Sequence, residues 1–427
     1  MFIVSLGLLF LLVALSLPVA AALGLLALIL DWAFAFLPLY RGLGEIAWSS
    51  STEFLLVAIP LFVLMGEILL RSGIAASVYQ SVSTWLGWLP GGLMHSNIGA
   101  CASFAAISGS TVATAATIGT VAVPEMDRMD YNKKLFLGTL ASGGTLGILI
   151  PPSINIIIYG ALTDTSIPEL YMAGIIPGLI LASLFGATVL VACLLKPELG
   201  GTKIHYSWQD RLKTLPDLLP PTFIFFVVIG SIYAGFATPT ESAALGVLCS
   251  LILAAIRNRL TINVLKESIE GAMQTTAMIM LIIVAAFFLN LVLASMGLPK
   301  AVSSFVTGLD YPPFIALLLI ILLYLVLGLF LETLTLMITT VPIVAPVVFS
   351  LGYDPVWFGI LLMILIETAL ITPPVGLNLY VIQGVRGSGK IDDVIVGALP
   401  FVAALLAMMA LLLAFPQIAL FLPQHFY

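Results

Sequence analysis

The sequence predicts an all-α polytopic membrane protein, in which many helices cross the bilayer. Of its 427 residues, 61% are hydrophobic and only 8% are charged, whereas soluble domains carry about 25% charged residues. A helix of roughly 20 apolar residues is long enough to span a bilayer. Asp, Glu, Lys and Arg are all absent from five long stretches, at residues 1–30, 72–124, 135–163, 271–299 and 394–427.

This composition excludes several classes of protein. Soluble enzymes, nucleic-acid-binding proteins and disordered tails need far more polar residues, and the strands of a membrane β-barrel alternate polar and apolar residues in short segments. The motifs HExxH, GxSxG, Walker A and the dinucleotide-binding glycine pattern are missing. The three cysteines are isolated and form no CxxC pair. We therefore expect no enzymatic activity, no organic cofactor and no nucleic-acid partner.

Two halves of the chain repeat one another. Pro124 and Pro346 lie 222 residues apart, and so do the Pro-Pro pairs that begin at Pro151 and Pro373. Further pairs with an offset of 222 or 223 are Tyr131 and Tyr353, Asn155 and Asn378, Gly174 and Gly397, and Pro177 and Pro400. A shared offset over this length predicts a duplication, with halves at 1–195 and 218–427 joined by a polar linker at 196–217.

Each half contains a helix that proline interrupts. Pro151 and Pro152 lie inside the apolar segment 135–160, and Pro373 and Pro374 lie inside 356–385. Proline lacks the N–H group that a helix needs, so both helices must break. In lipid, irregular backbone persists only where it lines a cavity. The freed carbonyl groups can bind a cation, and the N-terminus of a half-helix can face an anion. Paired interrupted segments of this kind indicate a secondary transporter.

Small polar residues cluster at four points within these apolar segments. Hydroxyl and amide oxygens are suited to a hard cation, and adjacent glycines allow the backbone to approach a ligand. Packing between helices is the alternative, because Ser, Thr and Gly also line close helix contacts in membranes. We predict that the clusters form an ion and substrate site from Ser108, Gly109, Ser110, Thr111 and Thr114; Pro151, Ser153 and Asn155; Glu332, Thr333 and Thr335; and Thr372, Pro373, Gly376 and Asn378.

Acidic residues within a membrane are functional candidates by default. Glu332 lies between two apolar segments and is the first candidate, with a water-facing turn as its alternative. Glu367 precedes the second Pro-Pro pair, and two roles are equally open for it: an ion ligand or a structural acid that faces the helix bundle. Glu53 and Glu67 lie near the ends of apolar segments, where structural roles are expected.

Three other polar features favour structural roles. Arg386 could attract a carboxylate, but an interfacial anchor explains it better, and His95 is expected to pack in the interior. The sequence Thr238-Pro239-Thr240-Glu241 is typical of a helix start, with Thr238 as N-cap and Glu241 completing a capping box.

Eight segments occur in a characteristic order along the whole chain. They are AIPLFVLMGEIL (58–69), GGLMHSN (91–97), ISGSTVATAATIG (107–119), IPPSINIIIYG (150–160), TPTESAALGV (238–247), FLETLTLMITTVPI (330–343), LITPPVGLNLYV (370–381) and ALPF (398–401). In this order and spacing they resemble the large membrane subunit of the tripartite ATP-independent periplasmic (TRAP) transporters.

The resemblance implies a sodium-driven elevator transporter for organic anions, typically carboxylates, in the bacterial inner membrane. It implies two inverted repeats, with re-entrant hairpins near 92–124 and 312–348 and broken helices at 135–160 and 356–385. Sodium would bind at the four clusters above, with the hairpin tips at 108–111 and 332–335. Glu332 departs from the family pattern, in which Asp-Pro is common after Phe-Leu.

The resemblance also implies partners. These are a small four-helix membrane subunit, here a separate chain, and a soluble periplasmic substrate-binding protein. Two other functions stay open at this point: a stand-alone carrier of the same fold, which would need no binding protein, and an ion channel. The sequence does not identify the organic acid.

The positions of basic residues predict the orientation of the chain. Loops rich in Lys and Arg favour the cytoplasm, and such residues occur in 128–134, 196–213 and 257–266, whereas the first 40 residues have none. We expect 196–213 in the cytoplasm and a periplasmic N-terminus. A cysteine replacing Lys203 should resist an impermeant thiol reagent in intact cells and react once the cells are opened. Labelling of this cysteine in intact cells would contradict the predicted orientation.

Overall fold

The computed structural model describes residues 2–15, 17–35, 37–202, 206–298, 301, 304, 308 and 312–426, and every regular element among them is helical. Six of these helices are long and apolar enough to cross a membrane, or up to eight spans if two bent helix pairs each count as one. The prediction of an all-helical polytopic protein is confirmed. Lys203 of the orientation prediction lies outside the described residues.

The first part of the chain is a series of short helices separated by turns. Pro18 separates the first two helices, as proline inside an apolar segment requires. The elements are α1 (Phe2–Ala14), α2 (Val19–Phe34), the 3-10 helix η1 (Leu39–Gly42), α3 (Leu43–Thr52), α4 (Ala58–Arg71) and α5 (Ile74–Leu86). Helices α4 and α5 form one of the bent pairs, with an angle of 71°.

Two series of five helices follow the duplicated pattern of the sequence. The first series is α6 (Leu93–Ser108), α7 (Thr111–Arg128), α8 (Lys133–Leu149), α9 (Ile154–Thr163) and α10 (Ile167–Leu195). The second is α16 (Pro313–Gly328), α17 (Thr333–Ser350), α18 (Pro355–Leu370), α19 (Leu377–Arg386) and α20 (Ile391–Ala414). Helices α7 and α17 both have 18 residues, and α9 and α19 both have 10. The helix boundaries thus repeat with the offset of the sequence.

The remaining helices join the two series and close the chain. They are the 3-10 helix η2 (Pro197–Gly200), α11 (Trp208–Thr214), the 3-10 helix η3 (Leu215–Leu218), α12 (Leu219–Tyr233), α13 (Pro239–Ile256), α14 (Ile262–Ser295) and α21 (Gln417–Phe426). The capping box predicted at the start of α13 is present: the Thr238 side chain accepts from the Glu241 N–H, and the Glu241 carboxylate accepts from the Thr238 N–H.

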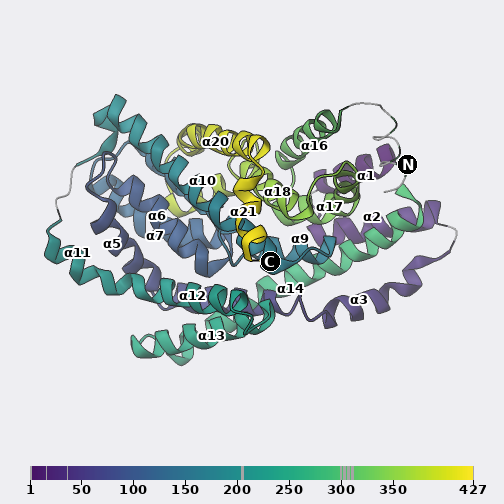
Figure 1. Ribbon diagram of the computed structural model, residues 1–427, viewed down its shortest axis with the longest axis horizontal. Coiled ribbons are helices and arrows are strands. Elements are labelled where there is room, and N and C mark those ends of the chain that lie inside the picture. The colour runs from purple at the N-terminus through teal and green to yellow at the C-terminus, as the bar shows by residue number, and fades with distance from the viewer. Residues whose placement is uncertain are drawn as a thin grey trace.

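The helices form two groups that lie against each other. Helices α2, α4, α13 and α14, here called the frame, pack on one another through α4 and α14. Figure 1 shows α3, α12, α13 and α14 along one long edge of the molecule, with α6, α7, α10, α18 and α20 above them. The two five-helix series contact the frame through pairs such as α4 with α6 and α14 with α17.

Helix α8 is the centre of the repeated helices, because glycines let its neighbours approach closely. All its residues from Leu135 to Leu149 are buried, as expected for a helix that is covered on every side. A Cβ added at Gly143 would lie 3.0 Å from the Cys101 sulfur of α6, and one added at Gly144 would lie 2.7 Å from Ala115 of α7.

The two broken helices run in opposite directions. The start of α8 packs on the start of α20, where a Cβ at Gly397 would overlap the Lys134 carbonyl. At the other end, the Tyr159 hydroxyl of α9 donates to the Pro355 carbonyl at the start of α18, at 2.7 Å. Since α19 leads within four residues to α20, α8–α9 and α18–α19 are antiparallel.

The contact between α8 and α20 generates a stability prediction. Gly397→Val would force side-chain atoms into the α8 backbone, and overpacking of this kind costs about 1–3 kcal/mol. The variant should therefore unfold at a lower temperature in detergent than the wild type. Gly230→Val in α12 is the matched control, because nothing lies within 4 Å of a Cβ there. Equal unfolding temperatures for the two variants would contradict the packing described.

Candidate functional site

The first hydroxyl-rich turn joins α6 to α7. Gly109 has φ +58°, a left-handed conformation that favours glycine, and Ser110 is the N-cap of α7. The Ser110 side chain accepts from the Ala113 N–H at 3.4 Å. The Thr114 hydroxyl donates to the Ser110 carbonyl at 2.7 Å and lies 2.8 Å from the Ser108 hydroxyl. The structure thus brings the predicted ligands of this turn together.

The first turn lies directly against the first break. A Cβ added at Gly109 would lie 2.9 Å from the Pro152 carbonyl oxygen, and one at Gly147 of α8 would lie 2.9 Å from the Ser110 backbone. On the frame side, a Cβ at Gly66 of α4 would lie 3.3 Å from the Ser108 carbonyl oxygen. The turn is therefore held between the frame and its own broken helix.

The first break leaves polar atoms without partners. Helices α8 and α9 meet at 41° across residues 150–153, and Pro151 lies in that segment. The Ser153 hydroxyl, the Asn155 amide nitrogen and the Thr111 hydroxyl of the neighbouring turn are buried and make no hydrogen bond within the described residues. An unpaired buried polar group costs about 1–3 kcal/mol, so these atoms are candidate contacts for an ion or a substrate.

At the second turn, Glu332 caps helix α17. One of its carboxylate oxygens accepts from the backbone N–H groups of Leu334 at 3.0 Å and Thr335 at 3.2 Å, and the other accepts from the Thr333 hydroxyl at 2.8 Å. A carboxylate is favourable at a helix N-terminus, where the dipole is positive. Glu332 stands 222 residues after Ser110, so corresponding residues cap α7 and α17.

The second break connects the two halves. Between α18 and α19, Gly376 has φ +50°, and the Thr372 hydroxyl donates to the Thr368 carbonyl at 2.6 Å. Just beyond Pro373 and Gly376, the Asn378 amide nitrogen donates to the Ala141 carbonyl of α8 at 3.0 Å. Its amide oxygen is buried and has no hydrogen-bond partner in the part of the chain that the structure describes. Asn378 thus bonds to the opposite half of the chain.

A cavity of about 770 Å³ joins the turns to the frame. Seven of the predicted site residues line it: Ser108, Gly109, Ser110, Thr111, Asn155, Glu332 and Thr333. The lining set described in the structure does not include Thr114, Pro151, Ser153, Thr335, Thr372, Pro373, Gly376 or Asn378. Ile154, Asn155 and Leu377 also line the cavity, which therefore unites both turns with the starts of α9 and α19.

Frame residues that the sequence analysis missed line the opposite wall of this cavity. They are Gly66 of α4 and Thr275, Met278, Ile279, Leu281 and Ile282 of α14, among others. Thr275 is a hydroxyl residue in the charge-free segment 271–299, which was the available signal. The other frame residues resemble ordinary lipid-facing or core residues in sequence.

Most other polar candidates have structural partners. Glu67 borders the cavity but forms an ion pair with Arg71 at 3.0 Å, and Arg71 also contacts Glu267. Arg386 forms an ion pair with Asp393 at 3.1 Å, which fastens the turn between α19 and α20. These contacts support the structural roles expected for Glu67 and Arg386.

Two further candidates lie away from this cavity. The His95 ring is buried and bonds to the Pro90 carbonyl at 2.9 Å, as a packing histidine does. Glu367 is fully buried in α18, and neither oxygen of its carboxylate makes a hydrogen bond within the described residues.

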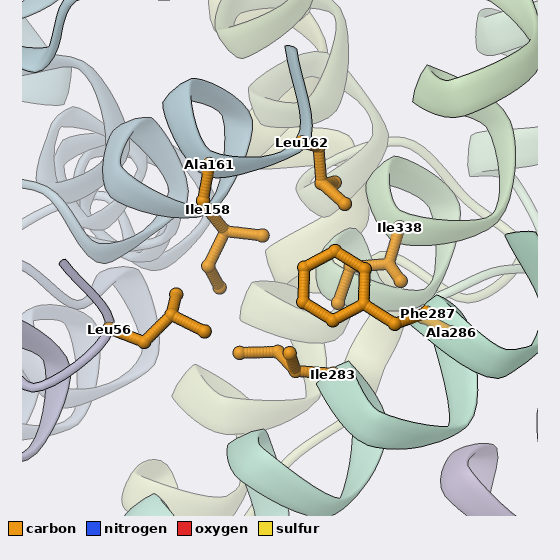
Figure 2. A pocket seen from close by; sticks show the side chains of 8 residues that line it. All are labelled: Leu56, Ile158, Ala161, Leu162, Ile283, Ala286, Phe287 and Ile338. Atoms are coloured by element: carbon orange, nitrogen blue, oxygen red, sulfur yellow. The ribbon is translucent and has the colours of Figure 1, made fainter. Parts of the chain in front are cut away.

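A second cavity of about 710 Å³ lies farther along α14. It is lined by Ser50 of α3 and Glu53 at its end, by Asp164 after α9, and by Phe287 and Leu291 of α14. A pocket of about 10 Å³ lies between the two cavities along α14, because Ile283 and Ala286 line it, after Ile282 of the first cavity and before Leu291 of the second. Figure 2 shows that the side chains around this small pocket consist of carbon atoms. These side chains are Leu56, Ile158, Ala161, Leu162, Ile283, Ala286, Phe287 and Ile338. An apolar layer thus separates two cavities on one frame helix.

Comparison with known proteins identifies the family. The family described as "Tripartite ATP-independent periplasmic transporter, DctM component" matches residues 6–418. The chain belongs to the DctM family. It is 33% identical over 387 residues to the C4-dicarboxylate TRAP transporter large permease protein DctM of Pseudomonas aeruginosa, covering 90% of each protein. The family assignment confirms the resemblance seen in the sequence and makes the chain a non-enzymatic component of a transporter in the membrane.

Two further similarities concern assembly and fold. The isethionate TRAP transporter permease protein DctMQ of Oleidesulfovibrio alaskensis is 32% identical, over 95% of this chain and 63% of that protein. The family is described as one component of a tripartite transporter, so this chain functions together with the other components of such a transporter. The solved YdaH transporter of Alcanivorax borkumensis shares the fold, with a TM-score of 0.67 at 15% identity over 95% of this chain and 97% of that one.

Proposed function

We propose that the chain is the transport subunit of a sodium-coupled symporter, which moves a small organic anion across the inner membrane by an elevator mechanism. It works with a small four-helix membrane subunit and a soluble periplasmic binding protein. The observation that carries the proposal is the cavity of about 770 Å³, because it joins the tips of both hydroxyl-rich turns to the frame helix α14.

An organic anion fits the electrostatics of this cavity. Lys, Arg and His are absent from its lining among the described residues, so positive potential comes from the starts of α7 and α9. Helix N-termini bind anions through their free N–H groups. The names of two relatives give C4-dicarboxylate and isethionate as their substrates, and both compounds are small organic anions.

Sodium coupling is supported by buried oxygen atoms in both halves. The hydroxyls of Thr111 and Ser153 in the first half and of Thr339 in the second make no hydrogen bond within the described residues. The Asn378 amide oxygen is equally unpartnered. Hard cations take oxygen ligands of this kind, so one sodium ion bound in each half would satisfy atoms that the fold leaves unpaired.

The elevator movement is supported by the arrangement of the helices. The broken helices are antiparallel, as inverted repeats require, and both five-helix series pack against the frame. The apolar layer on α14 separates the larger cavity, at the two turns, from the second cavity near α3. Sliding of the repeated helices along α14 would exchange which side is closed.

The proposal predicts steep sodium dependence. Uptake into proteoliposomes that contain this chain with its small subunit and binding protein should rise sigmoidally with sodium concentration, because two ions bind together. Uptake that persists unchanged when potassium replaces sodium contradicts the coupling. Saturable uptake by this chain alone would favour a stand-alone carrier, and non-saturating flux would favour a channel.

The two asparagines beyond the breaks test the ion sites. Asn155→Leu and Asn378→Leu remove amide groups whose lost interactions cost about 1–3 kcal/mol, or roughly 5–150-fold in an equilibrium constant. Each variant should raise the sodium concentration for half-maximal uptake. Ser250→Ala is the control, since Ser250 is buried in α13 and bonds only within that helix among the contacts described. A lower unfolding temperature with unchanged sodium dependence would limit both asparagines to helix packing.

A further inference from the structure

The two turns that meet in the cavity differ in charge. Helix α7 starts with the neutral Ser110 as its cap, whereas α17 starts with the carboxylate of Glu332 at the corresponding position. Both residues line the cavity. Of these two turns, the first therefore leaves the N-terminus of α7 open to an anion from outside the chain, whereas the second fills the N-terminus of α17 with a carboxylate of the chain itself.

The first turn and the start of α9 have donors without a partner among the described residues. Thr111 is 5% exposed and Asn155 is 7% exposed, and both line the cavity. The Thr111 hydroxyl and the Asn155 amide nitrogen make no hydrogen bond within the described residues. They lie at the first turns of α7 and α9, whose dipoles favour negative charge. One carboxylate of a substrate would accept hydrogen bonds from both of these donors.

The second turn already holds an anion. The Glu332 carboxylate accepts from the N–H groups of Leu334 and Thr335, which a second substrate carboxylate would otherwise use. No basic side chain lines this cavity in the described part of the chain, and Glu67, the other acid there, is paired with Arg71. A second substrate carboxylate would therefore meet like charge without compensation.

The same carboxylate can accept a hydrogen bond from a substrate. One Glu332 oxygen accepts only from the Thr333 hydroxyl among the described contacts, and a carboxylate oxygen has room for a further donor. An ammonium or hydroxyl group would fit there, whereas a carboxylate would not.

We propose that the substrate is a monocarboxylate with an amino or hydroxyl group at its far end, and that Glu332 excludes dicarboxylates. The Thr111 and Asn155 donors hold the substrate carboxylate, and Glu332 accepts from the far group. This assignment rests on the proposed function and gives it a substrate class.

Three four-carbon probes test the assignment: 4-aminobutyrate, 4-hydroxybutyrate and succinate. The purified chain in detergent with sodium is titrated with each probe, and its unfolding temperature is followed. Both monocarboxylates should stabilise the wild type at concentrations at least about tenfold lower than succinate does. Glu332→Gln should weaken the binding of 4-aminobutyrate by about tenfold and strengthen the binding of succinate by about tenfold. Asn155→Asp should abolish stabilisation by all three.

Glu332→Asp keeps a charged helix cap and should retain the wild-type preference, so it separates charge from the loss of a cap. Succinate binding as tight as that of the monocarboxylates in the wild type overturns the proposal, even if Glu332→Gln does not fold. An unchanged preference in Glu332→Gln, or stabilisation by sodium with no effect of either monocarboxylate, overturns it as well. Absence of any stabilisation by sodium in the wild type instead contradicts the proposed symport.

Discussion

A backbone that enters a bilayer has to satisfy its own polar groups, because lipid offers no hydrogen bonds. This constraint explains why the first Pro-Pro break, at Pro151 and Pro152, is buried in the interior of the protein. At the second break Pro373 is half-buried and Pro374 is exposed. Each break leaves N–H and C=O groups that a continuous helix would pair. The first break is covered by the turn at Gly109 and by α10, where a Cβ added at Gly174 would lie 2.6 Å from the Leu149 carbonyl oxygen. Irregular backbone and buried hydroxyls thus gather at the same place, and the larger cavity forms beside them.

Close packing around α8 makes that arrangement possible. Gly143 and Gly144 admit α6 and α7, while Gly138 meets Gly397 of α20. Side chains at these points would separate the helices and move the turn away from the break. The amide of Asn378 adds a hydrogen bond from α19 to the same helix. One helix of the first half therefore positions polar groups from both halves.

The duplication is close in backbone but unequal in chemistry. Helices α7 and α17 have equal lengths and start at corresponding positions, yet their caps are Ser110 and Glu332. Within the described residues, the Asn155 amide nitrogen and the Asn378 amide oxygen have no hydrogen-bond partner. Ser110 and Glu332 line the same cavity, so two similar scaffolds offer a neutral cap and a charged cap to one ligand, which a symmetric pair of sites could not do.

The sequence by itself determined the membrane class, the duplicated order of helices, the positions of both breaks and the cap at Thr238. These properties follow from hydropathy, proline and capping chemistry, which act over a few residues and are visible in any short window. The tertiary structure alone decided that Asn378 bonds to Ala141, 237 residues earlier, and that α14 forms a wall of the cavity. It also decided that Glu332 caps α17 while lining the cavity. Such contacts depend on how whole helices pack, and their residues have no distinguishing local pattern. The local sequence around a glutamate or asparagine in an apolar segment does not distinguish whether the residue binds an ion, caps a helix or joins two halves.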